Sequence, residues 1–436
     1  MTKITSDITH ATNRRRQCAR RRRASPARTP PYTAYAWHMG DRRVPPRRIG
    51  DSACWGALSM ALSSISKPPS DVGTSEGLPP IGPPKALRSA AAWAARAAEI
   101  DAHFRAFLGE PAETVAGSGA TTTLVDEWEL PWGSAKLFSQ PNGLRSRQLV
   151  LLLAPPGSAT SGAQTRPGAV VPFYHPDESA GIDLRSTRVP SAPPRNSPDD
   201  PMSENETIAY GRHLVDRGFI VACVEAFPFN QQSESQADAE TVAAAATSTH
   251  PIWQVATDKL LRENPRWTGM GKLTHAVRLA TDLLLEQPAV DPTRVLCIGH
   301  SLGGKMAFYA GCLDERIGAV IASDFGIGFS FTNWEADWYL GPPPYTNRGT
   351  GAELSLGHHH LLALMAPRPF LLIGGEFDDD RAWQYLEMAR PAYDICGAKP
   401  SALGFHNHAA GHRPPSSANE IAYRWLGSHF GEAGKL

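Results

Sequence analysis

Residues 295–305, VLCIGHSLGGK, decide the fold of this chain. The apolar run Val295–Ile298 predicts a buried strand, and Gly304–Leu313 predicts a helix. Between them lies a Gly-x-Ser-x-Gly turn with Ser301 at its centre. A strand, this turn and a helix form a nucleophile elbow, in which the sharp bend exposes the serine hydroxyl above the sheet. Positions 299 and 303 must be small because strand and helix pack closely behind the serine. The pattern therefore predicts that Ser301 is a nucleophile.

Short apolar runs alternate with helical stretches on both sides of this turn. This alternation is typical of a mostly parallel central sheet with helices on both faces, so the predicted fold class is α/β. Further expected strands are Ala169–Tyr174, Ile220–Val224, Ala319–Ala322, Pro369–Ile373 and Ala402–Phe405. Expected helices are Ala86–Leu108, Glu204–Arg217, Leu273–Glu286, Arg381–Tyr393 and Ala418–Phe430. An antiparallel pair, Thr122–Leu130 and Gln148–Leu153, should precede the parallel strands.

Composition divides the chain into two parts. Of the 436 residues, 43 are basic and 43 acidic, yet seven arginines lie between Arg14 and Arg23. Proline and serine are interleaved with them, so we predict a disordered basic tail and linker over residues 1–84 and a catalytic domain over 85–436. No nucleic-acid partner is expected for the catalytic domain. No apolar run reaches about 18 residues, so no transmembrane segment is expected. The compartment stays unknown, with cytoplasmic location favoured over export.

A serine hydroxyl needs a general base, and in this architecture the acid and then the histidine follow the serine along the chain. The loop after the last expected strand contains His406, His408 and His412. His412 follows Gly411 and precedes the final helix, where a flexible turn can place the imidazole over Ser301. The other two histidines lie closer to the strand, where local packing is the simpler interpretation. We therefore predict His412 as the general base.

The carboxylate that orients this imidazole has several candidates. Strand Pro369–Ile373 is followed by four acids in five positions, which are Glu376, Asp378, Asp379 and Asp380. They cannot all approach one imidazole, and we favour Asp378. The alternative Asp324 follows strand Ala319–Ala322, and so also lies at the carboxyl edge of the sheet.

An oxyanion hole needs two backbone N–H groups. Leu302, directly after the nucleophile, should supply one of them. The second should come from the loop after strand Ala169–Tyr174. There the donor is Tyr174 or His175, because Pro176 has no N–H.

Two further features concern ligands. The triplet His358–His360 does not predict a metal site, because successive residues on a helix point in different directions and no carboxylate or cysteine cluster accompanies them. No metal and no other cofactor is expected. An aromatic insertion near residues 328–358 carries Trp334, Trp338, Tyr339 and Tyr345. These rings could contact substrate or could simply pack a long loop onto the domain.

Three stretches carry a family resemblance. Gly299–Lys305, Leu364–Leu371 with its Ala-Pro-Arg-Pro phrase, and Gly374–Asp378 resemble the dienelactone-hydrolase and acetyl-xylan-esterase-like branch of the α/β-hydrolase superfamily. The resemblance extends over about residues 120 to 432. It implies an α/β-hydrolase fold, a Ser301–Asp378–His412 triad and no cofactor. Pro176 departs from the His-Gly that is common in this branch, which affects the second oxyanion donor.

The predicted activity is hydrolysis of a carboxylic ester through an acyl-enzyme. The expected partner is a small-molecule or carbohydrate-linked ester substrate. One alternative is a serine peptidase of the same fold, which is disfavoured because no propeller or peptide-binding module is evident. A second alternative is a catalytically silent binding protein, which is disfavoured because all three residue types occur in the right order.

Overall fold

The computed structural model describes residues 65, 67–68, 77–111, 121–143, 146–158, 165–182, 184, 206–230, 249–329, 334, 337–340 and 356–431. All of them belong to one compact unit, Asp51–Leu436. The arginine-rich segment of the predicted tail lies outside the described residues. Residues 77–84, expected as linker, contact the body of this unit. Ile81 is buried, and the carbonyls of Pro79 and Pro80 accept hydrogen bonds from His359 and His360.

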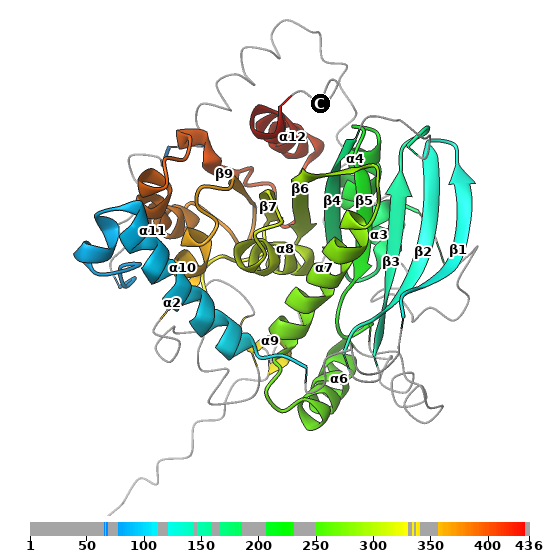
Figure 1. Ribbon diagram of the computed structural model, residues 1–436, viewed down its shortest axis with the longest axis horizontal. Coiled ribbons are helices and arrows are strands. Elements are labelled where there is room, and N and C mark those ends of the chain that lie inside the picture. The colour runs from blue at the N-terminus through cyan, green and yellow to red at the C-terminus, as the bar shows by residue number, and fades with distance from the viewer. Residues whose placement is uncertain are drawn as a thin grey trace, which may run out of the picture. The chain divides into compact units, whose positions relative to one another are not determined.

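A nine-stranded sheet organises the described residues (Figure 1). Its strands are β1 (Thr123–Leu130), β2 (Gly133–Pro141), β3 (Arg147–Ala154), β4 (Arg166–Phe173), β5 (Ile220–Glu225), β6 (Val290–His300), β7 (Ala319–Ser323), β8 (Phe370–Gly374) and β9 (Leu403–Asn407). Their order across the sheet is β1-β2-β3-β5-β4-β6-β7-β8-β9. The pairs along β1-β2-β3-β5 are antiparallel, and those from β5 to β9 are parallel. The predicted mostly parallel sheet is confirmed.

Helices cover both faces of this sheet. They are α2 (Ala90–Leu108), α3 (Pro176–Ala180), α4 (Tyr210–Val215), α6 (Thr249–Glu263), α7 (Gly269–Leu285), α8 (Leu302–Leu313), α9 (Asp337–Leu340), α10 (His358–Ala363), α11 (Ala382–Ile395) and α12 (Ser416–Phe430), with the 3₁₀ turns η1 (Pro84–Leu87) and η5 (Pro400–Ala402). Strand residues alternate between two cores, as a period of two requires. Val150 and Leu152 join the core with α2, α7 and α8, whereas Leu151 joins the core with α4 and α12. Helices α7 and α8 cross the near face in Figure 1.

Several elements differ from the sequence prediction. Strand β2 was not predicted, since GSAKLFSQP carries too few apolar residues to be recognised as a strand, and it separates β1 from β3, which were expected to pair with each other. Helix α6 was not predicted either. The helix expected over Glu204–Arg217 is confirmed over Tyr210–Val215. The helix expected to begin at Gly304 begins at Leu302, which makes Ser301 its N-cap residue. Within the described ranges, no helix is both long and apolar enough to cross a bilayer.

Candidate active site

Ser301 lies at a sharp bend between β6 and α8. Its φ of 54° and ψ of −115° are unusual for a residue with a side chain, so the bend is strained. Its backbone N–H donates to the carbonyl of Ser323 at 2.8 Å, which ties the bend to β7. A Cβ at Gly299 would lie 2.2 Å from the carbonyl oxygen of Gly303, and a Cβ at Gly303 would lie 2.1 Å from that of Pro172. Both positions therefore require glycine.

His412 lies in the loop between β9 and α12, beside the end of β6. Its ring centroid is 4.5 Å from that of His300, the residue directly before Ser301. On another side the ring of Phe377 meets it edge-on at 4.8 Å. Its Nδ1 lies 2.7 Å from Oδ2 of Asp324. The sequence-predicted base and nucleophile are thus brought to the same corner of the sheet.

Asp324 is the carboxylate that bonds to this imidazole. It follows β7 with a φ of 43° and is fully buried. Four backbone amides, from Gly375 to Asp378, donate to its two oxygens at 2.9 to 3.1 Å. Burial opposes ionisation, but the hydrogen bonds from His412 and these amides outweigh it and lower the pKa of Asp324. An ionised Asp324 can only accept, so Nδ1 of His412 is the donor.

The structure places Asp378, favoured by the sequence, away from this role. Its oxygens accept from the amides of Gly326 and Ile327 at 2.8 and 2.6 Å. The carboxylate bonded to His412 is Asp324, which corrects the choice of acid. The physical reason lies in the loop after β8: its amides converge on Asp324, and this turns the Asp378 side chain back toward the loop after β7. Burial, and then the neighbouring charge of Asp324, raise the pKa of Asp378 to about 7.

The other acids of this loop serve local contacts. Asp379 pairs with Arg381, and Asp380 accepts from the side-chain amide of Asn407 at 3.0 Å. Glu376 is exposed. Asp379 and Asp380 therefore make contacts near the surface, and Glu376 is solvated there.

The candidate oxyanion donors flank the elbow. Leu302 is the first residue of α8, where backbone N–H groups lack intrahelical partners. Tyr174 and His175 form the loop between β4 and α3, and Gly303 packs against the carbonyl of Pro172 at the end of β4. The side chain of His175 is buried, with Nδ1 3.9 Å from a carboxylate oxygen of Glu225. Because β4 and β6 are parallel neighbours, Leu302 and the Tyr174–His175 loop both follow the carboxyl ends of adjacent strands.

The histidine triplet is structural. His358 bonds to the Tyr309 hydroxyl and to the carbonyl of Ile327, at 2.8 and 2.7 Å. His359 and His360 hold the carbonyls of the Pro79–Pro80 segment. Burial lowers the pKa of all three, which keeps the imidazoles neutral. His359 and His360 therefore hold the Pro79–Pro80 segment against α10.

Comparisons with known proteins support the architecture. No family model matches the chain. The 4-O-methyl-glucuronoyl methylesterase 1 of Sodiomyces alcalophilus is 28% identical over 171 residues, which cover 33% of this chain and 34% of that protein. A carbohydrate esterase from an unknown prokaryotic organism is 25% identical over 132 residues, 26% of this chain and 29% of that protein. The chain thus matches about a third of the length of these curated relatives.

Solved structures match over far more of the chain. A glucuronoyl esterase from Solibacter usitatus has a TM-score of 0.59 at 17% identity, covering 85% of this chain and 100% of that one. A glucuronoyl esterase from Teredinibacter turnerae has a TM-score of 0.55 at 19% identity, covering 86% and 99%. This chain has the α/β-hydrolase fold. At such identities the likeness shows the fold alone.

One residue of this α/β-hydrolase site was not singled out from the sequence. Lys305, on the first turn of α8, is buried, and its Nζ donates to the carbonyl of Phe325. The ammonium also lies 4.1 Å from the ring centroid of Trp334 and 5.4 Å from that of Tyr339. Burial lowers its pKa to about 7. A lone lysine in the otherwise apolar stretch Gly303–Phe308 was the available signal.

The same contacts show what the described part of the aromatic insertion does. Trp334 and Tyr339 are buried, and Trp338 lies 5.5 Å, centroid to centroid, from Trp253 of α6. These rings pack onto the domain and cover Lys305. Tyr345 lies outside the described residues.

Proposed function

We propose that this α/β-hydrolase is a serine esterase with a triad of Ser301, His412 and Asp324. The observation that carries the proposal is the hydrogen bond between His412 Nδ1 and Asp324. The same imidazole packs on His300, the residue directly before the strained Ser301. An imidazole held at Nδ1 by a charged carboxylate keeps Nε2 for proton transfer. Ser301 is partly exposed at its bend, where an incoming ester can reach its hydroxyl.

In the proposed reaction, Ser301 Oγ attacks the acyl carbon while His412 Nε2 takes the hydroxyl proton. The developing imidazolium is stabilised by Asp324, whose lowered pKa keeps it ionised. The oxyanion is held by the N–H of Leu302 and one N–H from Tyr174 or His175. His412 then protonates the departing alcohol, and water attacks the acyl-enzyme with His412 again as base.

The proposed substrate is an ester of a carbohydrate carboxyl group, a uronic acid ester. Two observations support it. The curated relatives are a glucuronoyl methylesterase and a carbohydrate esterase, and the chain shares its fold with glucuronoyl esterases over most of its length. No cofactor is needed, since each step uses only side chains and backbone amides of the chain.

The test is Ser301→Ala in the full chain. We expect hydrolysis of methyl glucuronate and of p-nitrophenyl acetate to fall by a factor on the order of 10³ or more, because the nucleophile is lost. Labelling by a fluorophosphonate probe should disappear as well. Ser428→Ala is the matched control, because Ser428 is exposed on α12.

Three results would contradict the proposal in whole or in part. Full turnover in Ser301→Ala would exclude Ser301 as nucleophile. A wild-type chain that neither labels nor turns over any ester would instead favour the silent binding protein. Activity toward p-nitrophenyl acetate without activity toward methyl glucuronate would keep the esterase and reject the uronic acid ester.

A further inference from the structure

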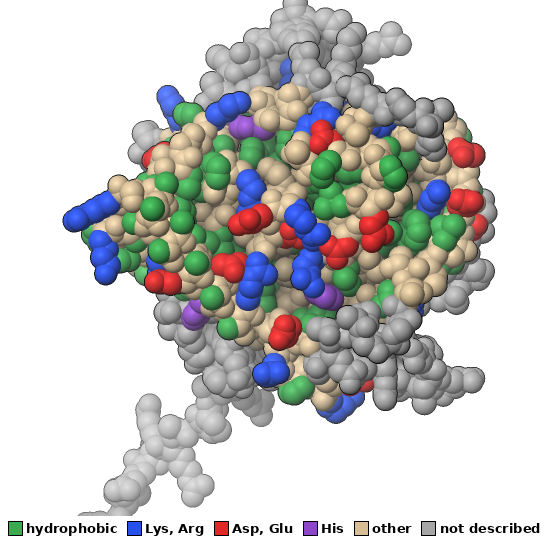
Figure 2. All heavy atoms as spheres, viewed as in Figure 1, with side chains coloured by type: hydrophobic (Ala, Val, Ile, Leu, Met, Phe, Trp, Pro, Cys, Tyr) green, Lys and Arg blue, Asp and Glu red, His purple; other side chains and the backbone are tan. Residues whose placement is uncertain are grey.

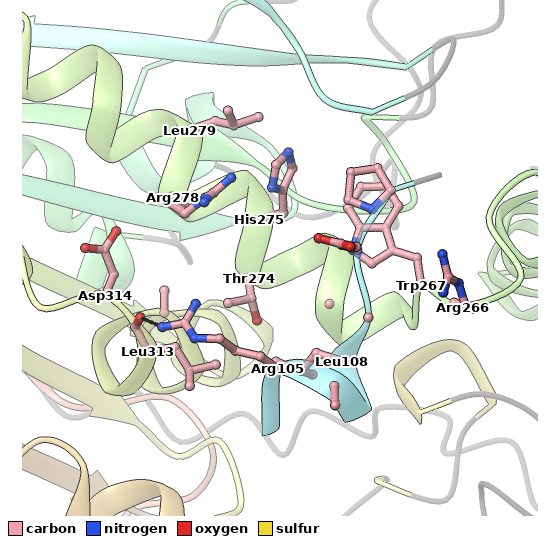
Figure 3. A pocket seen from close by; sticks show the side chains of 16 residues that line it. Arg105, Leu108, Arg266, Trp267, Thr274, His275, Arg278, Leu279, Leu313 and Asp314 are labelled. Atoms are coloured by element: carbon pink, nitrogen blue, oxygen red, sulfur yellow. Dashed lines mark hydrogen bonds between the residues drawn. The ribbon is translucent and has the colours of Figure 1, made fainter. Parts of the chain in front are cut away.

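A pocket of about 730 Å³ lies among the end of α2, helix α7 and the end of α8 (Figure 3). Helix α8 leads away from Ser301 and reaches the pocket with Ala310 and Leu313. Its 12 residues span about 18 Å at 1.5 Å per residue. None of the proposed triad lines this pocket, so it is separate from the candidate active site.

Arginines dominate the charge of the pocket. Arg266 and Arg278 are exposed, and within the described residues neither forms an ion pair at 4 Å or less, although the charge of Arg278 also acts on Asp314. In Figure 3 they lie on opposite sides, with Thr274 and His275 between them. Arg105 also lines the pocket, but its guanidinium is held by Asp101 and the carbonyl of Leu313. Two guanidinium groups are therefore available to an incoming anion.

The acids near this pocket offset only part of that charge. Asp314 is paired with Arg316 at 2.7 Å. Burial opposes its ionisation, but the pKa of Asp314 is lowered, mainly by Arg316 and also by the charge of Arg278. Glu110 is exposed at the lining. His275 packs edge-on against the Trp267 ring, and burial, with the charges of Arg278 and Lys272, lowers its pKa to about 3. A neutral imidazole adds no charge, so the pocket attracts anions through the arginines alone.

The surface around the pocket is strongly charged. Figure 2 shows basic and acidic side chains gathered near the centre of this face, over α7 and α8. Arg316 reaches across from the end of α8 to Asp282 of α7, and so ties the two helices together. Arg105 and Arg316 are thus held in ion pairs, whereas Arg266 and Arg278 form no such pair within the described part of the chain.

We propose that this pocket binds an acidic oligosaccharide through uronic acid carboxylates placed at Arg266 and Arg278. Two separated guanidinium groups suit negative charges spaced along a chain better than they suit one compact anion. Between them, the Thr274 hydroxyl and the Glu110 carboxylate can accept hydrogen bonds from sugar hydroxyls. The volume lies within the range of ordinary ligand pockets.

This inference rests on the proposed function in one respect only: a carbohydrate esterase with an acidic polymeric substrate benefits from a second contact. A site at the far end of the nucleophile helix would hold a chain whose ester is cut elsewhere. Such a contact raises the local concentration of substrate without taking part in the chemistry. It should therefore affect binding of oligosaccharides and leave the turnover of small esters unchanged.

The experiment measures calorimetric binding to the full chain carrying Ser301→Ala, which prevents turnover. The probes are a xylo-oligosaccharide bearing two uronic acid residues, the neutral oligosaccharide of the same length, and inorganic phosphate. We expect binding of the acidic oligosaccharide and weakening by about tenfold or more in Arg266→Gln/Arg278→Gln, since charge-assisted contacts are lost. Arg88→Gln, an exposed arginine just before α2, should bind like the parent.

Several outcomes would overturn the proposal. They are equal affinity in the double variant and the parent, equal affinity for the neutral oligosaccharide, or phosphate binding that matches the oligosaccharide. The double variant is also made with Ser301 intact and assayed on p-nitrophenyl acetate. Unchanged turnover there shows that the fold survives. Loss of oligosaccharide binding with small-ester turnover preserved is the supporting result, and it stands apart from any failure of the esterase assay.

Discussion

Two acidic loops meet at the carboxyl edge of the sheet, one after β7 with Asp324 and one after β8 with Asp378. Both carboxylates are fully buried, and both accept hydrogen bonds from the backbone amides of the other loop. Yet the pKa of Asp324 is lowered and that of Asp378 is raised to about 7. The difference lies in the number and kind of donors. Asp324 has four amides and an imidazole, whereas two amides contact Asp378.

This comparison teaches that burial alone does not decide the role of a carboxylate. Without enough donors, desolvation favours the protonated form, which cannot stabilise an imidazolium. With enough donors the charge survives, and the group can orient His412 and balance its charge. Asp378 instead fastens the loop of Asp324 through Gly326 and Ile327. We infer that Asp324 acts on His412 and that Asp378 positions Asp324.

The largest expected effect comes from Asp324→Asn. The neutral amide cannot stabilise the imidazolium of His412, and its NH₂ group favours the wrong tautomer of the ring. We therefore expect kcat for p-nitrophenyl acetate to fall by about 10³ to 10⁴. Asp379→Asn, at a partly exposed acid paired with Arg381, is the control and should be close to wild type. If Asp324→Asn kept full activity, Asp324 would not be the carboxylate that orients His412, and Asp378 would again be the candidate.

A smaller effect on activity, and a distinctive one on stability, is expected from Asp378→Asn. The raised pKa means that, between about pH 4 and 7, the folded protein holds a proton that the unfolded chain has released. Wild-type stability should therefore fall as pH rises through this window, by an amount on the order of a few kcal/mol. The variant lacks this proton and should not show that part of the slope.

Urea unfolding at pH 5 and pH 7.5 measures this difference. The kcat of Asp378→Asn should fall by about tenfold or less, because it acts on Asp324 through the loop and not on the imidazole. Identical pH dependence of unfolding in wild type and variant would contradict the raised pKa. A loss of kcat as large as that of Asp324→Asn would remove the distinction between the two acids.

The smallest effect is expected from Phe377→Leu. The ring of Phe377 meets His412 edge-on at 4.8 Å, and such contacts contribute about 0.5–1.5 kcal/mol. Leucine keeps the backbone N–H that donates to Asp324, so kcat should fall by less than about tenfold. Kinetics across pH 5 to 9 would check it. A loss comparable to that of Asp324→Asn would mean that the ring, and not the carboxylate, sets the position of the imidazole.

Much of the fold could be predicted from local pattern. The elbow at 299–303 depends on glycines whose Cβ atoms would collide with neighbouring backbone, and such a requirement is visible in sequence. Buried parallel strands such as β7 and β8 are short apolar runs, which are also visible. Strand β2 was missed because its polar residues conceal the alternation. The pocket was missed as well, because its lining comes from three segments, within 105–111, 266–279 and 310–314, that lie far apart in the chain.

By itself, the sequence determined the α/β alternation, the bend at Ser301 and a histidine in the last loop, because each depends on neighbours within a few residues. Only the tertiary structure decided which carboxylate meets that histidine. Asp324 and Asp378 both follow strands at the same edge, and the outcome depends on which loop directs its amides at which acid. The positive φ of Asp324 and the converging amides of residues 375–378 are set by packing between distant segments, and no local pattern records them.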